Sequence, residues 1–176
     1  IAGSVGSIIL EIDKFMIGEL KAIENVAYYA VAIYIASVIG VPSRSMLQIT
    51  NPITAKLLND KDIVGLDVLY KKSSVSLFII GGLIFLLIVL NINQLYELIP
   101  EKFSGGLLVV FVVGIAKLVD NISGNNNAIL FNSDYYRAVL GLWVFVAIIT
   151  VVLNLVLIPK YDINGAAIAT FISIVV

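Results

Sequence analysis

The sequence predicts an all-α, polytopic transmembrane helix bundle of about six spans. Of its 176 residues, 60% are hydrophobic and only 13% are charged, and the mean hydropathy is +1.06. A soluble domain has roughly 45–50% apolar and about 25% charged residues, so this composition indicates a lipid environment. Several apolar runs also reach the length of about 20 residues that a helix needs to cross a bilayer.

Polar turns separate these apolar runs, and we expect a single lobe over 1–176. The expected spans lie near 1–20, 25–46, 73–95, 103–131, 138–157 and 163–176. The chain begins at Ile1 rather than Met and ends inside an apolar run. It also lacks the basic start and cleavage site of a signal peptide. We therefore expect a fragment of a longer membrane protein.

Two prolines mark breaks in and after the second span. Pro42 removes a backbone donor and should kink the helix. Asn51-Pro52 has the pattern of an N-cap followed by proline at the first helical position, which predicts a separate short helix over 53–58. The second span also has tyrosines gathered toward one end, as interface aromatics are: Tyr28, Tyr29 and Tyr34.

Six spans place the loop after the second span and the loop after the fourth span on one side. This side carries five basic residues: Lys56, Lys61, Lys71, Lys72 and Arg137. The other side carries three: Lys21, Lys102 and Lys160. Because Lys and Arg favour the cytoplasm, we expect the first side to be cytoplasmic.

The fourth span carries ionic and amide side chains at membrane depth. Lys117 lies about 21 Å along this run, near its middle, where a charge costs roughly 2.5–3.5 kcal/mol. Asp120 is three residues further, on the same helix face, so the two can partly neutralise each other. Asn121 and Asn125 extend this stripe, which must face a bundle interior or a wet cavity. We interpret it as the lining of a polar pathway; the alternative is polar glue between helices.

Glycines at two places suit close helix contact. Gly124, within the polar stripe, lets a neighbouring backbone approach. Gly81-Gly82, in the middle of the third span, predicts a packing notch or a flexible point.

The first span holds a second charged cluster. Glu11 and Lys14 are three residues apart and can pair, and Asp13 lies between them. The alternative is that these residues mark the interfacial end of the span. Asn154 is the one strongly polar residue near the end of the fifth span.

Composition excludes several classes of function. The chain has no Cys and no His, which excludes thiol nucleophiles, Ser-His-Asp triads, imidazole metal sites and disulfides. It has no P-loop motif, and a net charge of −1 offers no basic surface for nucleic acid. We expect a protein that is not an enzyme, with no catalytic residues, no metal, no cofactor and no nucleic-acid partner.

A set of short motifs is spread over nearly the whole chain. They are Asp13-Lys-Phe-Met-Ile-Gly18, Ala27-Tyr-Tyr-Ala-Val-Ala32, Pro42-Ser-Arg-Ser-Met-Leu-Gln-Ile49, Asn51-Pro-Ile53, Leu69-Tyr-Lys-Lys-Ser-Ser74, Lys117-Leu-Val-Asp120, Gly124-Asn125, Ser133-Asp-Tyr-Tyr-Arg137, Asn154-Leu-Val-Leu-Ile-Pro-Lys-Tyr161 and Asn164-Gly-Ala-Ala-Ile-Ala-Thr170. In this order and spacing they resemble the bacterial polysaccharide and O-antigen flippases of the multidrug/oligosaccharidyl-lipid/polysaccharide exporter superfamily, above all the Bacteroidetes-type versions. One departure is Asp162, where the family pattern has glycine.

The resemblance implies a MATE-like transporter of about twelve to fourteen helices in two six-helix lobes. This chain would be most of the second lobe, and the N-terminal lobe of the same protein would be missing from it. The implied activity is alternating-access transfer of an undecaprenyl-pyrophosphate-linked oligosaccharide, among membrane lipids, across the bacterial inner membrane.

Roles for the polar residues follow from this resemblance. Lys14 and Lys117 would attract the headgroup phosphates. Asp13 or Asp120 would balance charge or couple transport to H⁺ or Na⁺. The sugar contacts would come from the amides: Asn121, Asn125 and Asn154.

Two other functions stay open. An efflux pump for small cationic compounds, from the same superfamily, would need an acidic cavity without compensating cations, and Lys14 and Lys117 argue against it. A membrane scaffold that translocates nothing would use the same charges as bridges between helices.

Overall fold

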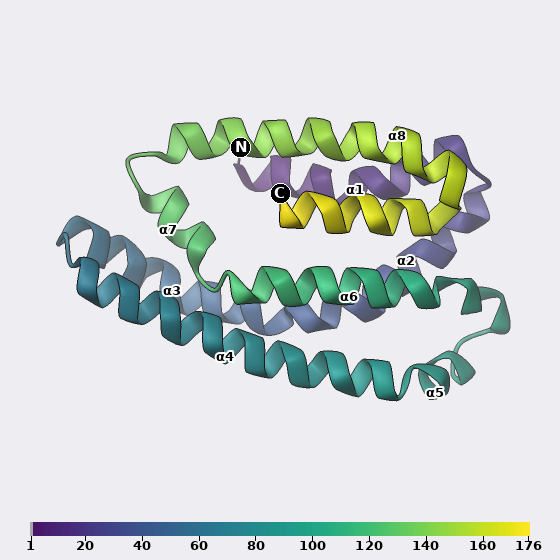
Figure 1. Cartoon of the computed structure of the whole chain (residues 1–176), viewed down its shortest axis with the longest axis horizontal. Helices are drawn as coiled ribbons and strands as arrows, with labels where there is room; N and C mark the ends of the chain where they lie inside the picture. Colours follow the sequence, from purple (N-terminus) through teal and green to yellow (C-terminus); the bar gives the residue numbers. More distant parts are fainter. Residues whose placement is uncertain (1) are drawn as a thin grey trace.

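The computed structural model describes residues 2–176, and the side chains of residues 11–176 except those of Glu101, Lys102 and Ser104. Every regular element in this part of the chain is a helix (Figure 1). The elements are α1 (Ala2–Leu20), α2 (Ile23–Ser37), η1 (Val38–Gly40), α3 (Val41–Asn59), α4 (Ile63–Leu90), α5 (Ile92–Glu97), η2 (Glu101–Gly106), α6 (Leu107–Ile122), α7 (Asn126–Asn132) and α8 (Tyr136–Val175).

Three helical stretches among the described residues are long and apolar enough to cross a membrane. They are the continuous α2–α3 stretch, α4 and α8; α6 and α7, which meet at an angle of 57°, would make a fourth if they form one broken span. The prediction of an all-helical protein is therefore confirmed, and the apolar helices indicate a membrane protein. The count of six spans and the second lobe stay predictions.

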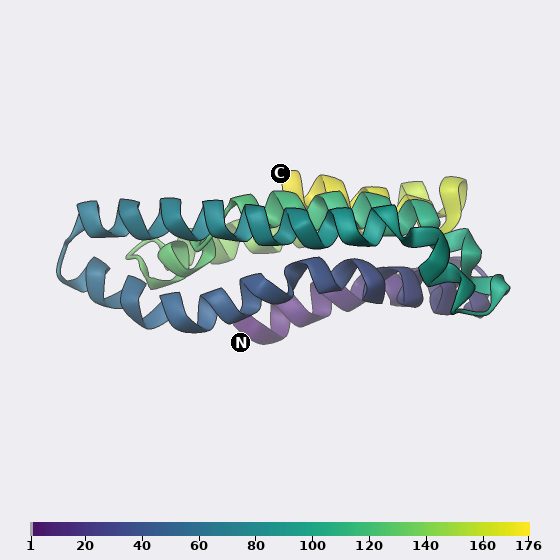
Figure 2. The same ribbon diagram turned by 90° about the horizontal axis from the view of Figure 1, so that it is seen from below.

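The predicted fourth span, now α6 and α7, supplies the central helix of the bundle. The helices lie side by side along one direction (Figures 1 and 2), and α6 packs against α2, α4 and α8. Its buried residues recur at helical spacing, so they form one broad face of the helix. These residues are Val109, Val110, Val113, Gly114, Ala116 and Asn121.

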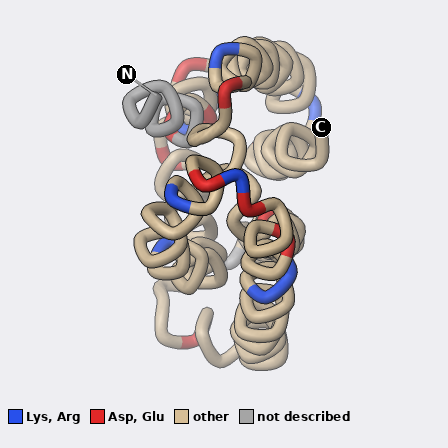
Figure 3. The backbone as a smooth tube through the Cα atoms, turned by 90° about the vertical axis from the view of Figure 1, so that its left-hand side faces the viewer, with Lys and Arg blue, Asp and Glu red and all other residues tan. Residues whose placement is uncertain are grey.

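The turns between helices gather at two ends of the bundle. The α3–α4 and α7–α8 turns share one end, whereas the α1–α2 turn, α5 and the reversal within α8 share the other (Figure 1). Figure 3 looks onto the first end, where acidic and basic residues occupy the nearest turns. The sequence predicted this grouping of turns, and the cytoplasmic orientation of the first end stays a prediction.

The second apolar stretch is longer than predicted. It runs from Ile23 to Asn59 and contains the 3-10 turn η1 just before Pro42, at the place where the sequence predicted a kink. The separate helix predicted over 53–58 is wrong, because Pro52 lies inside α3. Thr50 and Thr54, on either side of this proline, are buried against neighbouring helices, and this packing offsets the missing backbone donor.

The last helix, α8, reverses direction at Asp162. This residue has φ 53° and ψ −136°, and the two arms of α8 lie side by side (Figure 1), joined by a bond of 2.8 Å from Thr150 Oγ1 to Ser173 Oγ. The Asp162 carboxylate pairs with Lys21 Nζ at 2.6 Å, which ties the reversal to the α1–α2 turn. A positive φ with this ψ is open to glycine and disfavoured for residues with a Cβ.

We expect Asp162→Gly to raise the free energy of unfolding by about 1 kcal/mol. Relief of the disfavoured backbone contributes roughly 1–3 kcal/mol, and loss of the exposed ion pair with Lys21 removes about 0–1 kcal/mol. Unfolding in detergent, followed by circular dichroism, measures the change. Asp162→Ala loses the same ion pair but keeps a Cβ, so it should not stabilise the protein; equal gains for both variants would contradict the strain at this position.

Candidate functional site

A buried carboxylate, that of Asp13 on α1, is held by polar side chains from α2 and α8. Asp13 is only 5% exposed. Its Oδ1 accepts a hydrogen bond from Asn154 Nδ2 at 2.6 Å. Its Oδ2 accepts bonds from Thr170 Oγ1 at 2.6 Å and from Tyr29 OH at 3.1 Å. We call these four residues the Asp13 cluster; in the described part of the chain, no ion pair involves its carboxylate.

The reversal of α8 assembles this cluster. Asn154 and Thr170 stand equally far from Asp162 along the sequence, on opposite arms of α8, so the reversal brings them to the same level. Because α1 packs against both α8 and α2, its carboxylate reaches both arms and also Tyr29. Residues that are far apart in the chain therefore meet at one carboxyl group.

The geometry of the cluster fits either protonation state of Asp13. Thr170 Oγ1 lies 2.6 Å from Asp13 Oδ2 and 3.0 Å from the Ala166 carbonyl oxygen. Its hydroxyl has one proton, so Thr170 donates to an ionised Asp13, or accepts from a protonated Asp13 and donates to Ala166. Asn154 Oδ1 is buried and has no hydrogen-bond partner among the described residues. Such a set of oxygens suits a proton or a small hard cation.

A second polar cluster lies where α6 ends. Asn121 and Asn125 are both fully buried. Asn121 Nδ2 donates to the Ile39 carbonyl oxygen at 3.1 Å. Asn125 Nδ2 donates to Thr54 Oγ1 at 3.0 Å, and Ser73 Oγ donates to Asn125 Oδ1 at 3.1 Å. These bonds tie the α6–α7 junction to η1, α3 and α4, so in this conformation both amides act as glue between helices.

Glycines make room for this second cluster, as the sequence predicted. At Gly124, where φ is 57°, a Cβ would collide with the Ser73 and Ser74 hydroxyls of α4. At Gly81 a Cβ would overlap the amide nitrogen of Asn121. The predicted close approach at the first glycine and the predicted notch at the second are both confirmed.

The two ionic residues of α6 are partly buried and unpaired. Among the described residues, neither Lys117 nor Asp120 has an ion-pair or side-chain hydrogen-bond partner, so the predicted mutual neutralisation is absent. The Lys117 side chain lies beside Gly40 of η1: its Cδ is 3.6 Å from the position that a Cβ there would take.

Lys14 differs from Lys117, because its charge is already paired. Its Nζ lies 2.9 Å from Glu11 Oε2, which confirms the predicted contact. The neighbouring Asp13 is therefore not neutralised by Lys14, although the two are adjacent in the sequence.

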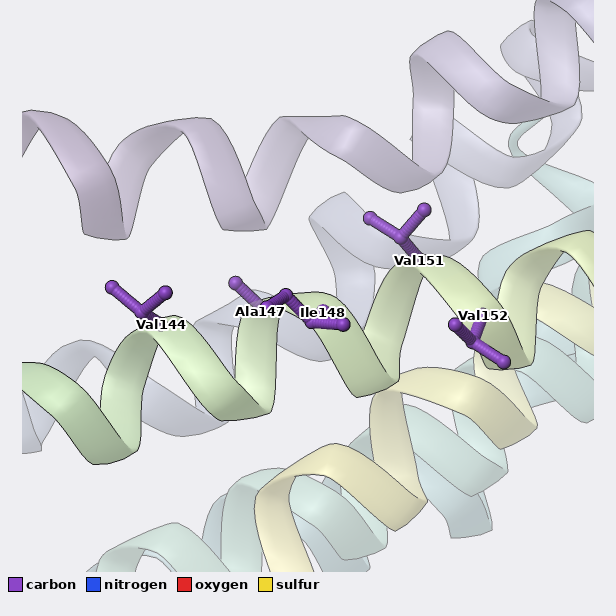
Figure 4. Close-up of a pocket in the computed structure, with 5 residues that line it drawn as sticks. All are labelled: Val144, Ala147, Ile148, Val151 and Val152. Atoms are coloured by element: carbon purple, nitrogen blue, oxygen red, sulfur yellow. The ribbon is translucent and has the colours of Figure 1, made fainter.

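The candidate residues do not share a single hollow. Hydrogen bonds place Asp13 and Asn154 in the first cluster and Asn121 and Asn125 in the second. An open hollow of about 390 Å³ lies on α8 (Figure 4), and its lining is apolar throughout. It is lined by Val144, Ala147, Ile148, Val151 and Val152.

Tyr29 belongs to the Asp13 cluster, whereas its place among the tyrosines of the second span predicted a position at the membrane interface. That prediction is wrong: Tyr29 is 1% exposed, and Ala32 and Ala36 on the same helix face are fully buried. The spacing of one tyrosine and two alanines at i, i+3 and i+7 is the signal of a packed face. Thr170 was also missed, although it stands in the small-residue run that α1 packs against.

We expect Asn125→Ala to lower the free energy of unfolding by about 1–2 kcal/mol, because an interhelical hydrogen bond in a membrane protein contributes roughly 0.6–2 kcal/mol. The substitution removes the partner of Thr54 and of Ser73. Melting in detergent provides the measurement. Asn126→Ala, at the exposed next position, should change stability by less than about 0.5 kcal/mol, and similar losses for both would argue against the bonding at Asn125.

No protein-family model, curated protein or solved structure matches this chain. The described part of the chain also contains no group of three or more His, Cys, Asp or Glu side chains that could hold a metal ion. Its function is therefore inferred from the contacts of its own residues.

Proposed function

We propose that this chain is one lobe of a flippase in the bacterial inner membrane, and that it is not an enzyme. Its cargo would be a lipid-linked oligosaccharide, carried on undecaprenyl pyrophosphate from the inner to the outer leaflet by alternating access. The observation that carries the proposal is the unpaired Lys117 on the central helix α6. The motifs that resemble polysaccharide flippases add the class of cargo.

An unpaired lysine at this position favours an anionic ligand. A lysine at the middle of a bilayer costs roughly 2.5–3.5 kcal/mol on insertion scales, and no described carboxylate offsets this for Lys117. A pyrophosphate would supply the missing partner through charge-assisted hydrogen bonds. Lys14 is a weaker candidate, because Glu11 already holds its ammonium.

The Asp13 cluster supports coupling to an ion. Its carboxylate is bonded to α2 and to both arms of α8. Binding of H⁺ or Na⁺ at Asp13 would change all of these bonds together, so the ion could bias the lobe toward one of two conformations. Asp120, beside Lys117 on α6, would instead balance charge.

The sugar contacts expected of the three amides have less support. Asn121, Asn125 and Asn154 are fully buried and bonded to other helices. Contact with a sugar would require these helices to separate first. The proposal therefore rests on the headgroup and the ion rather than on the amides.

Replacement of Lys117 tests the headgroup assignment. We expect Lys117→Ala in the full-length protein to weaken binding of the pyrophosphate-linked cargo about tenfold or more, since a hydrogen bond to a charged group contributes roughly 1.5–3 kcal/mol. Surface glycan export should fall accordingly. Lys72→Ala, which removes an exposed lysine of α4, is the control. Undiminished export by Lys117→Ala would remove the assignment.

One observation favours the efflux alternative. The Asp13 carboxylate is not compensated by any described cation, and an exporter of cationic compounds needs such an acid. However, Asp13 is buried among its own hydrogen-bond partners, so a drug-sized molecule would have to separate α1, α2 and α8 to reach it. Loss of drug resistance without loss of glycan export, in cells that lack the protein, would favour efflux.

Asp13→Asn tests ion coupling, because it removes the ionisable group and keeps the size of the side chain. We expect the dependence of transport on a pH or Na⁺ gradient to fall about 5- to 150-fold, the range of typical coupling energies. Transport into proteoliposomes gives the readout. Glu19→Gln, at an exposed acid of the same helix, should keep the gradient dependence; a similar loss in both variants would point to a general charge effect.

The scaffold alternative draws on the second cluster, where Asn121 and Asn125 lock helices together. A scaffold has no reason to keep Lys117 unpaired at the centre of the bundle. It also predicts that Lys117→Ala leaves export unchanged, so the same experiment separates the two functions.

A further inference from the structure

Two helical stretches of the bundle are interrupted close to Asn121. The α2–α3 stretch is interrupted by η1, Val38–Gly40. The α6–α7 stretch bends by 57° across residues 123–125, where Gly124 takes a left-handed conformation. Asn121 lies two residues before this bend and bonds to Ile39 of η1, so the last turn of α6 links the two interruptions. A helix bends most easily where its hydrogen-bond ladder is interrupted.

The third helix at the level of Asn121, α4, is continuous but carries Gly81-Gly82 there. Asn121, in the last turn of α6, fits into the notch at Gly81. The same amide nitrogen donates to the Ile39 carbonyl oxygen of η1 at 3.1 Å. One fully buried side chain therefore connects the weak points of all three helices.

Beyond this level, three segments hold together as a unit. Asn125 bonds to Thr54 of α3 and Ser73 of α4, and α3 packs against α4 and α7. We call α3, α7 and the first half of α4 the end block. Figure 2 shows α3 and α4 extending as a hairpin past the beginning of α1.

On the other side of the level, the remaining helices pack against one another: α1 against α2 and α8, and α6 against α2 and α8. The contact between the end block and α8 includes the rings of Phe131 and Trp143, whose centroids are 5.9 Å apart.

We infer that the level of Asn121 is a hinge, about which the end block rotates against the remaining helices, and that Asn121 is its latch. The interruptions at η1 and at residues 123–125 absorb the changes in φ and ψ, as hinge residues at element ends do. Gly81 leaves the space on α4 that the Asn121 side chain occupies. This inference does not depend on the proposed cargo.

Distances between spin labels test the hinge. The chain has no cysteine, so cysteine pairs can be introduced at exposed positions. The first pair, which measures a distance across the hinge, is Lys56 on α3 and Leu142 on α8. The control pair is Leu86 on α4 and Leu142, which lie on the same side of the hinge. In the full-length protein in lipid nanodiscs, pulsed electron paramagnetic resonance should give two distances for the first pair and one for the second.

Three variants test the latch. Asn121→Ala should shift the ratio of the two distances by about fivefold or more, the lower range of conformational coupling. Gly81→Ala should shift it in the same direction, because its Cβ displaces the Asn121 amide. Gly82→Ala adds the same methyl group at the next position, where a Cβ meets nothing within 4 Å, and should leave the ratio unchanged.

The controls also define failure. An unchanged distance for the Leu86–Leu142 pair shows that a variant has kept its fold. If Gly81→Ala cannot fold, Asn121→Ala still tests the latch, because this substitution adds no volume. The hinge would be overturned if the Lys56–Leu142 pair gave a single distance in the wild type and the same single distance in Asn121→Ala. Equal shifts by Gly81→Ala and Gly82→Ala would overturn the role of Asn121 as the latch. Neither result would bear on export by Lys117→Ala.

Discussion

Lipid offers no hydrogen-bond partners, and this constraint organises the polar side chains of the protein. Each amide and carboxyl group at membrane depth must be satisfied by another helix, or by water or ligand inside the bundle. Asp13 meets this requirement with three donors from α2 and α8, and Asn125 meets it with two hydroxyls from α3 and α4. Helix packing and polar chemistry therefore cannot be separated here.

The same constraint makes Lys117 informative. It lies on the helix that contacts α2, α4 and α8, and yet it has no ionic partner in the described part of the chain. Asn125 lies on the same stretch, but it is fully buried between two hydroxyls, whereas Lys117 is partly exposed and lies beside Gly40. Asn125 stabilises the packing of the helices, and Lys117 is the residue to which the proposed function assigns the headgroup of the cargo.

Hydrophobic runs predicted that the chain is helical, and glycines predicted two close contacts between helices, because both signals are local. The notch at Gly81 and the close approach at Gly124 follow from the lack of a Cβ, and the Glu11–Lys14 pair follows from helical spacing. The extent of α3 could not be predicted, since tertiary packing around Pro52 overrides a local signal. The Asp13 cluster could not be predicted either, because the partners of Asp13 depend on the reversal at Asp162.

During synthesis of this chain, Asp13 is made long before its hydrogen-bond partners on α8. Asp13 and its partner Asn154 are separated by 141 residues, which a ribosome adds in roughly 7–28 s at about 5–20 residues per second. During that interval the first helix would sit in the translocon or the lipid with its carboxyl group unshielded by α8. Until both arms of α8 are inserted, the Asp13 carboxyl group of α1 would therefore be more stable if it were protonated, or if it were bound by another protein such as an insertase.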